Sequence, residues 1–220
     1  MALDTVIFDI DGLLIDSEPL WNEAASEVLF NYGITLTEKQ YVSTTGLRTR
    51  EFVDWWFDYF NISKNAAATA EEQIISSVLG KIEEQGIVMK GVLPIFKFFH
   101  QKRFKIGLAT SSPQELIDLV VKMAGIGNYL MATASAQDLP YGKPHPQVYL
   151  NCAAQLESEP TSCVAFEDSF NGMIAAKAAR MKCVVVPHHA QLREERWAAA
   201  DLKLSSLLNF GELHFGMLAG

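Results

Sequence analysis

The sequence lacks the features that would place the protein in a membrane, outside the cell or on nucleic acid. No apolar run approaches the roughly 18 to 20 residues that a membrane-spanning helix needs. Residues 1–3 lead straight into strand-like sequence, without the basic and apolar regions of a secretory signal. Basic residues are outnumbered, with 18 Lys and Arg against 26 Asp and Glu, and the net charge of −8 disfavours binding to nucleic-acid backbones. We therefore expect neither a membrane nor a nucleic-acid partner.

Cysteine is also scarce. The three cysteines, Cys152, Cys163 and Cys183, have no metal-ligand spacing and are surrounded by apolar residues. An odd number of cysteines without a pairing pattern is typical of reduced, buried thiols in a cytoplasmic protein. We therefore expect a cytoplasmic location.

What is present is an alternation of short apolar runs and helical patterns. The strand-like runs are 5–8, 105–109, 129–134, 163–166 and 183–186, and helical patterns cover 113–123, 145–156 and 171–180. Such alternation is typical of a parallel sheet with helices on both faces. At 220 residues, the chain suits one domain, or one domain that carries a smaller insert.

The first strand-like run is separated from the others by a helical segment. Apolar residues recur at helical spacing within 20–29, 51–60 and 70–85, with no convincing strand among them. We predict an α/β fold, a doubly wound, Rossmann-like parallel sheet core formed by residues 1–15 and 88–220. An all-helical cap domain, residues 16–87, is inserted after the first strand. Ligands of such sheets bind at the carboxyl ends of the strands.

Polar residues follow the first two of these strands. Asp9 and Asp11 stand at the end of the first strand, just before Gly12. Asp and Gly also favour turns for reasons of their own, so this pair alone leaves both interpretations open. Thr110 and Ser111 end the second strand, and their position beside a helix start suits a phosphate.

The helix after the second strand has its own start signals. Ser112, Pro113 and Glu115 have the spacing of an N-cap, a first helical residue and a capping-box partner. A well-capped helix without any ligand explains the same residues.

A lysine and two further carboxylates complete the set. Lys143 lies between Gly142 and Pro144, which hold it in a tight loop, although a solvated loop lysine would look the same. Glu167 and Asp168 end a later strand, where they would repel each other unless a cation or water separates them. An acidic helix N-terminus is the alternative interpretation. Because all these residues fall at one edge of the predicted sheet, we interpret them as one site.

These motifs resemble those of the haloacid dehalogenase superfamily of phosphotransferases. The chain carries all four in order: Asp9-x-Asp11-Gly12, Thr110, Lys143 and Glu167-Asp168. The segments 9–21, 139–153 and 166–186 are further similar to phosphoglucomutase-like sugar-phosphate phosphatases, such as 2-deoxyglucose-6-phosphatase and hexitol phosphatases.

The resemblance implies roles for the motif residues. Asp9 would be the nucleophile that forms an aspartyl-phosphate, and Asp11 the general acid and base. Mg²⁺ would be held by the Asp9 carboxylate, the Asp11 backbone carbonyl and Asp168, with Glu167 as a ligand or an outer-shell neighbour.

The remaining roles concern the substrate. Thr110, Ser111 and Lys143 would bind the phosphoryl group. Glu18 and Arg48 are candidates for substrate contact from the cap, and Arg48 could equally be a surface arginine at a helix start. The expected reaction is hydrolysis of a small sugar or sugar-alcohol phosphate by a cytoplasmic monomer.

Three other functions use similar residues. A β-phosphoglucomutase-type isomerase shares the same motifs. A carbon–halogen hydrolase would not need Asp11, because a leaving halide requires no proton. A receiver-like signalling domain also uses acidic residues, Mg²⁺, Thr or Ser and Lys, but it is shorter and lacks an insert after the first strand.

Overall fold

The computed structural model describes residues 2–219, and it contains one parallel sheet. The strand order is β3-β2-β1-β4-β5-β6, and every neighbouring pair is parallel. The bounds are β1 (Thr5–Phe8), β2 (Lys105–Thr110), β3 (Ala132–Ser135), β4 (Cys163–Glu167), β5 (Lys182–Val185) and β6 (Leu202–Lys203). The predicted α/β fold with a doubly wound parallel sheet is confirmed.

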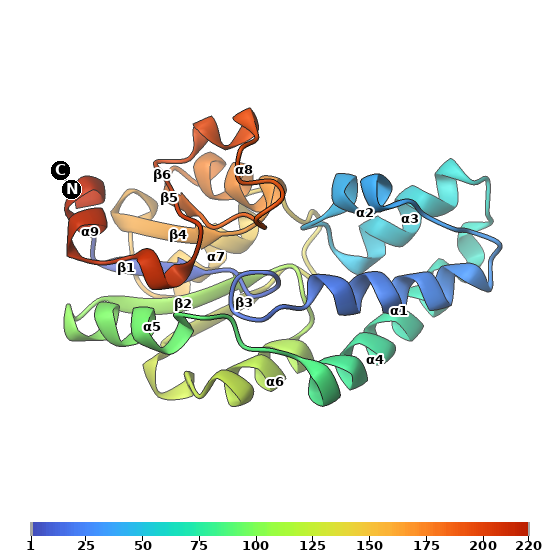
Figure 1. Ribbon diagram of the computed structural model, residues 1–220, viewed down its shortest axis with the longest axis horizontal. Coiled ribbons are helices and arrows are strands. Elements are labelled where there is room, and N and C mark those ends of the chain that lie inside the picture. The colour runs from blue at the N-terminus through green and yellow to red at the C-terminus, as the bar shows by residue number, and fades with distance from the viewer. Residues whose placement is uncertain (1, 220) are drawn as a thin grey trace.

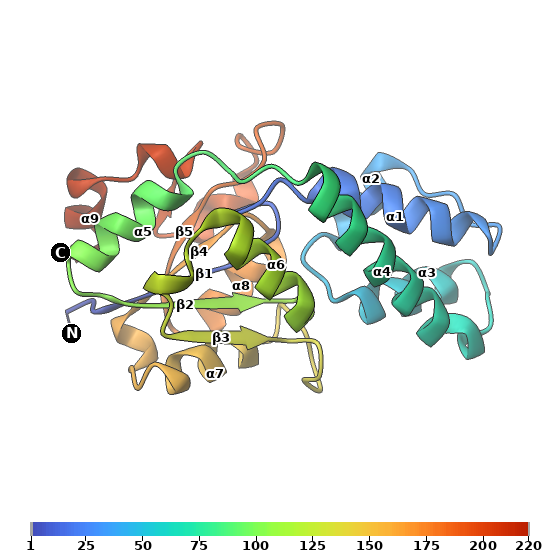
Figure 2. The same cartoon turned by 90° about the horizontal axis from the view of Figure 1, so that it is seen from below.

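Alternate side chains of the strands pack on opposite faces of the sheet. The helices of the core are α5 (Val92–Gln101), α6 (Gln114–Ala124), α7 (Gln147–Gln155), α8 (Phe170–Ala178) and α9 (Glu212–Ala219). Phe8 and Phe166 stack on one face with ring centroids 4.9 Å apart, and Phe96 of α5 stacks on Phe8 at 4.7 Å. On the other face, Ile7 and Ala165 join a separate cluster with α7 and α8. Figure 2 shows α5 and α6 in front of the sheet and α8 behind it.

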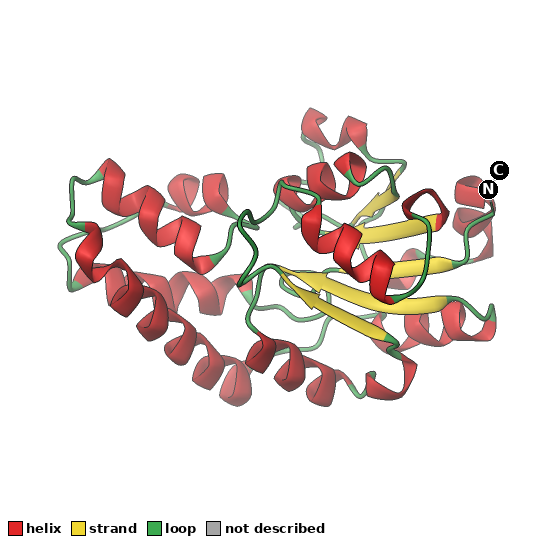
Figure 3. Ribbon diagram, turned by 180° about the vertical axis from the view of Figure 1, so that it is seen from behind, coloured by secondary structure: helices red, strands yellow, loops and turns green. Residues whose placement is uncertain are grey.

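Four helices gather beyond the carboxyl ends of the strands (Figure 1), and Figure 3 shows no strand among them. They are α1 (Glu18–Phe30), α2 (Glu38–Thr44), α3 (Thr49–Tyr59) and α4 (Ala67–Gln85). Their buried faces pack on one another, with α4 contacting both α1 and α3. We use the name cap for residues 16–87.

The two connections between the cap and the sheet lie side by side. Ile15 pairs with Val88 in an isolated antiparallel bridge. Asp16 N–H donates to the Ile87 carbonyl at 2.9 Å, and Met89 N–H donates to Leu14 at 2.9 Å. We propose this pairing as the boundary between core and cap.

The structure adds elements that the sequence patterns did not predict. Helix α5 follows the cap directly, and β6 adds a short edge strand beyond β5. The predicted cap of α6 is wrong: the helix begins at Gln114, and its N-cap residue is Pro113. Ser112 precedes this N-cap residue, and its hydroxyl donates to Asp11. Within residues 2–219, none of the helices combines the length and apolar character needed to cross a bilayer.

Candidate active site

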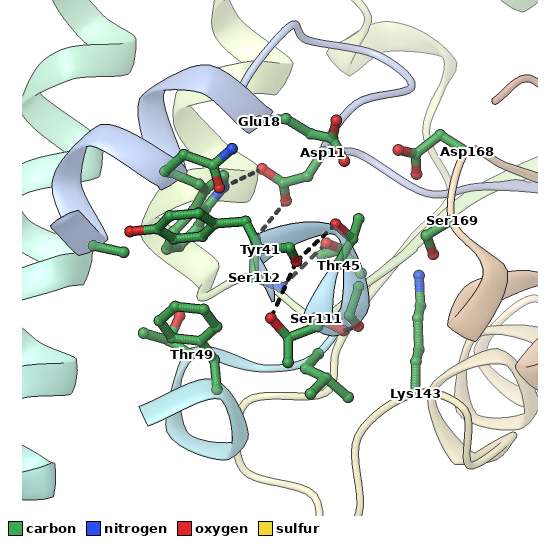
Figure 4. A pocket seen from close by; sticks show the side chains of 18 of the residues that line it. Asp11, Glu18, Tyr41, Thr45, Thr49, Ser111, Ser112, Lys143, Asp168 and Ser169 are labelled. Carbon is green, nitrogen blue, oxygen red and sulfur yellow. Dashed lines mark hydrogen bonds between the residues drawn. The ribbon is translucent and has the colours of Figure 1, made fainter. Parts of the chain in front are cut away.

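The polar residues at the strand ends meet in one pocket beneath the cap. β1 lies between β2 and β4, so Asp9, Thr110 and the pair Glu167 and Asp168 follow adjacent strands. Figure 4 shows Lys143, Asp168 and Ser169 on one side of this pocket and Tyr41 and Thr49 on the opposite side. The pocket therefore has a core half and a cap half.

Lys143 is the centre of the core half. Its side chain is almost fully buried, and Nζ lies 2.7 Å from Asp9 Oδ1 and 2.6 Å from Glu167 Oε1. The same ammonium donates to the Ala109 carbonyl at 3.1 Å. Three acceptors thus fix the lysine, as its tight loop suggested.

Glu167 is fully buried, and both of its oxygens have donors. Tyr149 Oη donates to Oε1 at 2.5 Å, the oxygen that also receives Lys143. Ser169 donates to Oε2 through its hydroxyl at 3.1 Å and its N–H at 3.3 Å. Gly172 makes room for this carboxylate, since a Cβ there would lie 1.9 Å from Glu167 Oε1. Glu167 therefore holds Lys143 in place.

Burial and mutual charge set the pKa values of this cluster. Burial raises the pKa of Asp9 to about 7, with a further increase from Glu167, while Lys143 opposes the shift. Burial alone would lower the pKa of Lys143, but Asp9 and Glu167 outweigh it, so its pKa is raised and the ammonium stays charged. Burial, then the charges of Glu18 and Asp9, raise the pKa of Asp168 well above its usual value. One lysine does not neutralise this group of carboxylates.

The acidic cluster has the composition of a magnesium site. Carboxylate oxygens of Asp9, Glu167 and Asp168 all lie within 4.8 Å of one another. Gly12, with a φ of +73°, leaves the space beside them open, because a Cβ there would lie 2.1 Å from Asp168 Oδ2. An all-oxygen donor set with excess negative charge suits a hard divalent cation. The residues present therefore fit Mg²⁺.

Asp11 is oriented by donors from both halves of the pocket. Ser17 Oγ and Trp21 Nε1 each donate to Oδ1 at 2.7 Å, and Ser112 Oγ donates to Oδ2 at 2.5 Å. Ser17 is the N-cap residue of α1, yet its hydroxyl makes no capping hydrogen bond and donates to Asp11. The cap thereby contacts the predicted acid and base directly.

The residues at the carboxyl end of β2 lie in the same pocket. Thr110 is buried, and its hydroxyl oxygen accepts the Ser112 N–H at 3.1 Å. Ser111 Oγ donates to the carbonyl of Gly46, in the cap, at 3.0 Å. Both residues line the pocket beside Asp9.

Glu18 lines the cap half of the pocket, as predicted for a substrate-contacting residue. It belongs to one face of α1, on which Glu18, Trp21, Asn22 and Ala25 all reach the pocket. Burial, then the charges of Asp16 and Asp11, raise the pKa of Glu18. This side chain faces the reacting groups without belonging to the acidic cluster around Lys143.

Arg48 does not line the pocket in this structure. Its guanidinium donates to the carbonyls of Ala136 (3.1 Å), Gln137 (3.3 Å) and Leu139, in the loop that leads to Lys143. Glu51 accepts from Arg48 at 2.7 Å and from the Gly142 N–H at 3.0 Å. Arg48 thus joins the cap to the core loop, and the interpretation as a substrate contact receives no support from its position.

Several site residues were not predicted from the sequence. Tyr149 supports Glu167, whereas Trp21 and Ser112 orient Asp11. Trp21 follows Asp11 by ten residues, and no spacing rule signals a hydrogen bond across that interval. Tyr149 lies on α7, at a position where the helical pattern predicts a core residue and not a site residue.

Comparison with known proteins identifies the family of this chain. Residues 3–180 match the family model described as haloacid dehalogenase-like hydrolase. Hexitol phosphatase B of Escherichia coli K12 is 42% identical over 202 residues, covering 91% of each chain. Fructose-1-phosphate phosphatase YqaB of the same strain is 29% identical over 184 residues, covering 82% of this chain and 95% of the relative.

Solved structures share the fold over nearly the whole chain. The crystal structure of β-phosphoglucomutase from Clostridium difficile superposes with a TM-score of 0.87 and 23% identity, covering 97% of this chain and 96% of the other. The resemblance drawn from the four motifs is confirmed. The chain belongs to the haloacid dehalogenase-like hydrolase family.

Proposed function

We propose that this protein is a Mg²⁺-dependent phosphatase that hydrolyses monophosphate esters of small sugars or sugar alcohols through an aspartyl-phosphate. One observation carries the proposal: a buried Lys143 holds Asp9 beside Glu167 and Asp168, at the floor of a cap-covered pocket. Hexitol phosphatase B and fructose-1-phosphate phosphatase support the substrate class by their names.

Asp9 is the nucleophile of the first step. Lys143 donates to Oδ1, which leaves Oδ2 to attack the phosphorus. The P–O bond to the sugar breaks as the Asp9–phosphorus bond forms, and Asp11 gives its proton to the leaving alkoxide. Ser17, Trp21 and Ser112 keep the Asp11 carboxyl oriented for that transfer.

The second step uses the same residues in reverse roles. The ionised Asp11 takes a proton from water, and the resulting hydroxide attacks the phosphorus. Asp9 leaves as a carboxylate, and inorganic phosphate is released. Asp11 thereby regains the proton that it gave to the alkoxide in the first step.

Charge stabilisation comes from groups that are already in position. Lys143 balances one negative charge, and bound Mg²⁺, held by Asp9, the Asp11 carbonyl and Asp168, would supply two more positive charges beside the phosphoryl oxygens. The Thr110 hydroxyl accepts from Ser112 and keeps its own proton for a phosphoryl oxygen. The Ser111 N–H is the second donor that we assign to the phosphoryl group.

A test of the function is inorganic phosphate release from a panel of hexose, deoxyhexose, hexitol and nucleoside monophosphates, with Mg²⁺ or excess chelator. We expect Mg²⁺-dependent release that is fastest with the sugar and hexitol phosphates. Each reaction is also searched for phosphate isomers, because an isomerase would yield these in place of free phosphate. A folded protein that releases no phosphate from any ester would contradict the proposal.

A further inference from the structure

The charged side chains that line the pocket are mostly carboxyl groups, and the one cation among the described lining residues belongs to the core half. Among the described residues that line the pocket, Lys143 is the sole cation, and it is occupied by Asp9 and Glu167. The lining also includes four carboxyl groups, those of Asp9, Asp11, Glu18 and Asp168. A second anionic group on a substrate would therefore meet no positive charge.

The positive charges of the cap lie elsewhere. Residues 16–87 contain five basic residues: Lys39, Arg48, Arg50, Lys64 and Lys81. None of them lines the pocket, and all but Lys39, which is exposed, form ion pairs with acidic residues. The nearest to the site, Arg48, is used by Glu51 and three loop carbonyls.

Two polar side chains on α1 face the pocket without a protein partner. Glu18 and Asn22 are one helical turn apart, and both line the pocket. Within residues 2–219, no hydrogen-bond donor or acceptor is found for either side chain. A carboxyl and an amide group together accept and donate hydrogen bonds, which is what a chain of hydroxyl groups requires. Figure 4 shows Glu18 beside Asp11, the residue that we propose protonates the leaving alkoxide.

From this distribution we infer that Glu18 and Asn22 are specificity-determining residues, which select phosphate monoesters of neutral polyols. Substrates with a second phosphate or a carboxylate on the alcohol are rejected. The inference rests on the proposed phosphatase function and narrows it. Glu18 supplies no positive charge in either protonation state, and as a carboxylate it repels a second anion.

The inference also bears on the isomerase alternative. When a phosphoryl group passes from an aspartyl-phosphate to a sugar that keeps its own phosphate, the product is a bisphosphate. An isomerase of this type must therefore hold a second phosphate in the cap half while the first is transferred. A cap half that offers Glu18 and no cation is unsuited to that state.

Matched substrates provide the test. Glucitol 6-phosphate and 6-phosphogluconate share the phosphoester end and differ only at carbon 1, which carries a hydroxyl or a carboxylate. Fructose 6-phosphate and fructose 1,6-bisphosphate form a second pair. For the wild-type protein, we expect kcat/KM to favour the neutral member of each pair at least about 30-fold, because juxtaposed like charges cost several kcal/mol. High salt should reduce this ratio by screening.

Substitutions at Asn22 and Glu18 test whether these two residues cause the preference for neutral substrates. Asn22→Lys places a cation in the pocket, where it can attract the second anionic group of a substrate. The ratio of kcat/KM for the neutral substrate to kcat/KM for the anionic one should therefore fall about tenfold or more. Glu18→Gln should also reduce it and raise KM more than it lowers kcat. Glu23→Gln is the control: it removes the same charge from the same helix, but Glu23 is exposed, pairs with Lys81 and does not line the pocket.

The outcomes separate the two proposals. Equal turnover of matched substrates, or a ratio that Asn22→Lys leaves unchanged, overturns the specificity inference and leaves the phosphatase function standing. If no monoester yields phosphate, the proposed function fails and the inference fails with it. Asn22 is exposed, so this variant keeps the test valid even if Glu18→Gln does not fold.

Discussion

The two halves of the pocket are built in opposite ways. In the core half, Lys143 and its partner Glu167, which is buried outside the pocket lining, have all their side-chain polar atoms engaged by protein partners. In the cap half, Glu18 and Asn22 face the pocket with no such partners among residues 2–219. The difference indicates that the protein fixes its reacting groups before any substrate arrives, whereas the cap leaves its polar groups for the substrate.

The largest effect should follow the loss of the nucleophile. Asp9→Asn should abolish phosphate release from every substrate, because the amide cannot form the aspartyl-phosphate. Circular dichroism and thermal unfolding should show a folded protein, since the side chain keeps its shape. Asp138→Asn, in the loop before Lys143, is a control that changes the same charge. Full activity in Asp9→Asn would remove Asp9 from the mechanism.

Removing the buried cation should damage both catalysis and folding. Lys143→Met leaves the carboxylates of Asp9 and Glu167 without their partner, which should lower the free energy of unfolding by about 3 to 5 kcal/mol. Urea denaturation measures this loss, and activity should be lost as well. Lys122→Met is the control, because Lys122 is exposed on α6. Equal stability of the two variants would show that the core half is not organised around Lys143.

Acid should weaken the binding of Mg²⁺. Mg²⁺ needs ionised ligands, and the pKa of Asp9 is raised to about 7 when no cation is bound. Below pH 7, the apparent affinity should therefore fall about tenfold per pH unit for each proton displaced. Calorimetric titration with Mg²⁺ between pH 5.5 and 8 measures the slope. A constant affinity across that range would argue that the acidic cluster does not bind the metal.

The smallest effect is expected at the contact between Arg48 of the cap and the core loop of residues 136–139. Arg48→Ala removes the hydrogen bonds to the 136–139 loop, so kcat/KM should fall about threefold while the free energy of unfolding drops by about 1 to 3 kcal/mol. The order of preferred substrates should not change, because Arg48 does not line the pocket. Arg50→Ala is a matched control two residues further on, in the first turn of α3, where Arg50 pairs with Asp54 at 3.1 Å. A changed order of substrates would restore Arg48 as a substrate contact.

The sequence predicted the core half of the site better than the cap half. Asp9, Thr110, Lys143 and Asp168 follow strands or tight loops, and the rule that strand ends share one edge of a parallel sheet brings them together. No comparable rule places cap side chains. Arg48 illustrates this, since its direction depends on the 136–139 loop, which is remote in the sequence.

The elements of the fold likewise divide into those that local sequence patterns predicted and those that they did not. The five longer strands follow from apolar runs, while β6 has two residues and leaves almost no pattern to find. The helix-start signals around Ser112 indicated a helix that begins one residue too early, because Pro113 is the N-cap residue of α6. The Ser112 hydroxyl instead donates to Asp11 at 2.5 Å, a contact between residues 101 positions apart that no local pattern reveals.

The side-by-side connections at Ile15 and Val88 also bear on the order of folding. β1 pairs with β2 and β4, whose first residues are Lys105 and Cys163, so its partners follow only after the whole cap. The contacts within the cap close shorter loops than these strand pairings do, and short loops form faster. We therefore expect the cap helices to associate while β1 is still unpaired. The strand that carries the nucleophile would then be secured late, when the distant halves of the sheet come together around it.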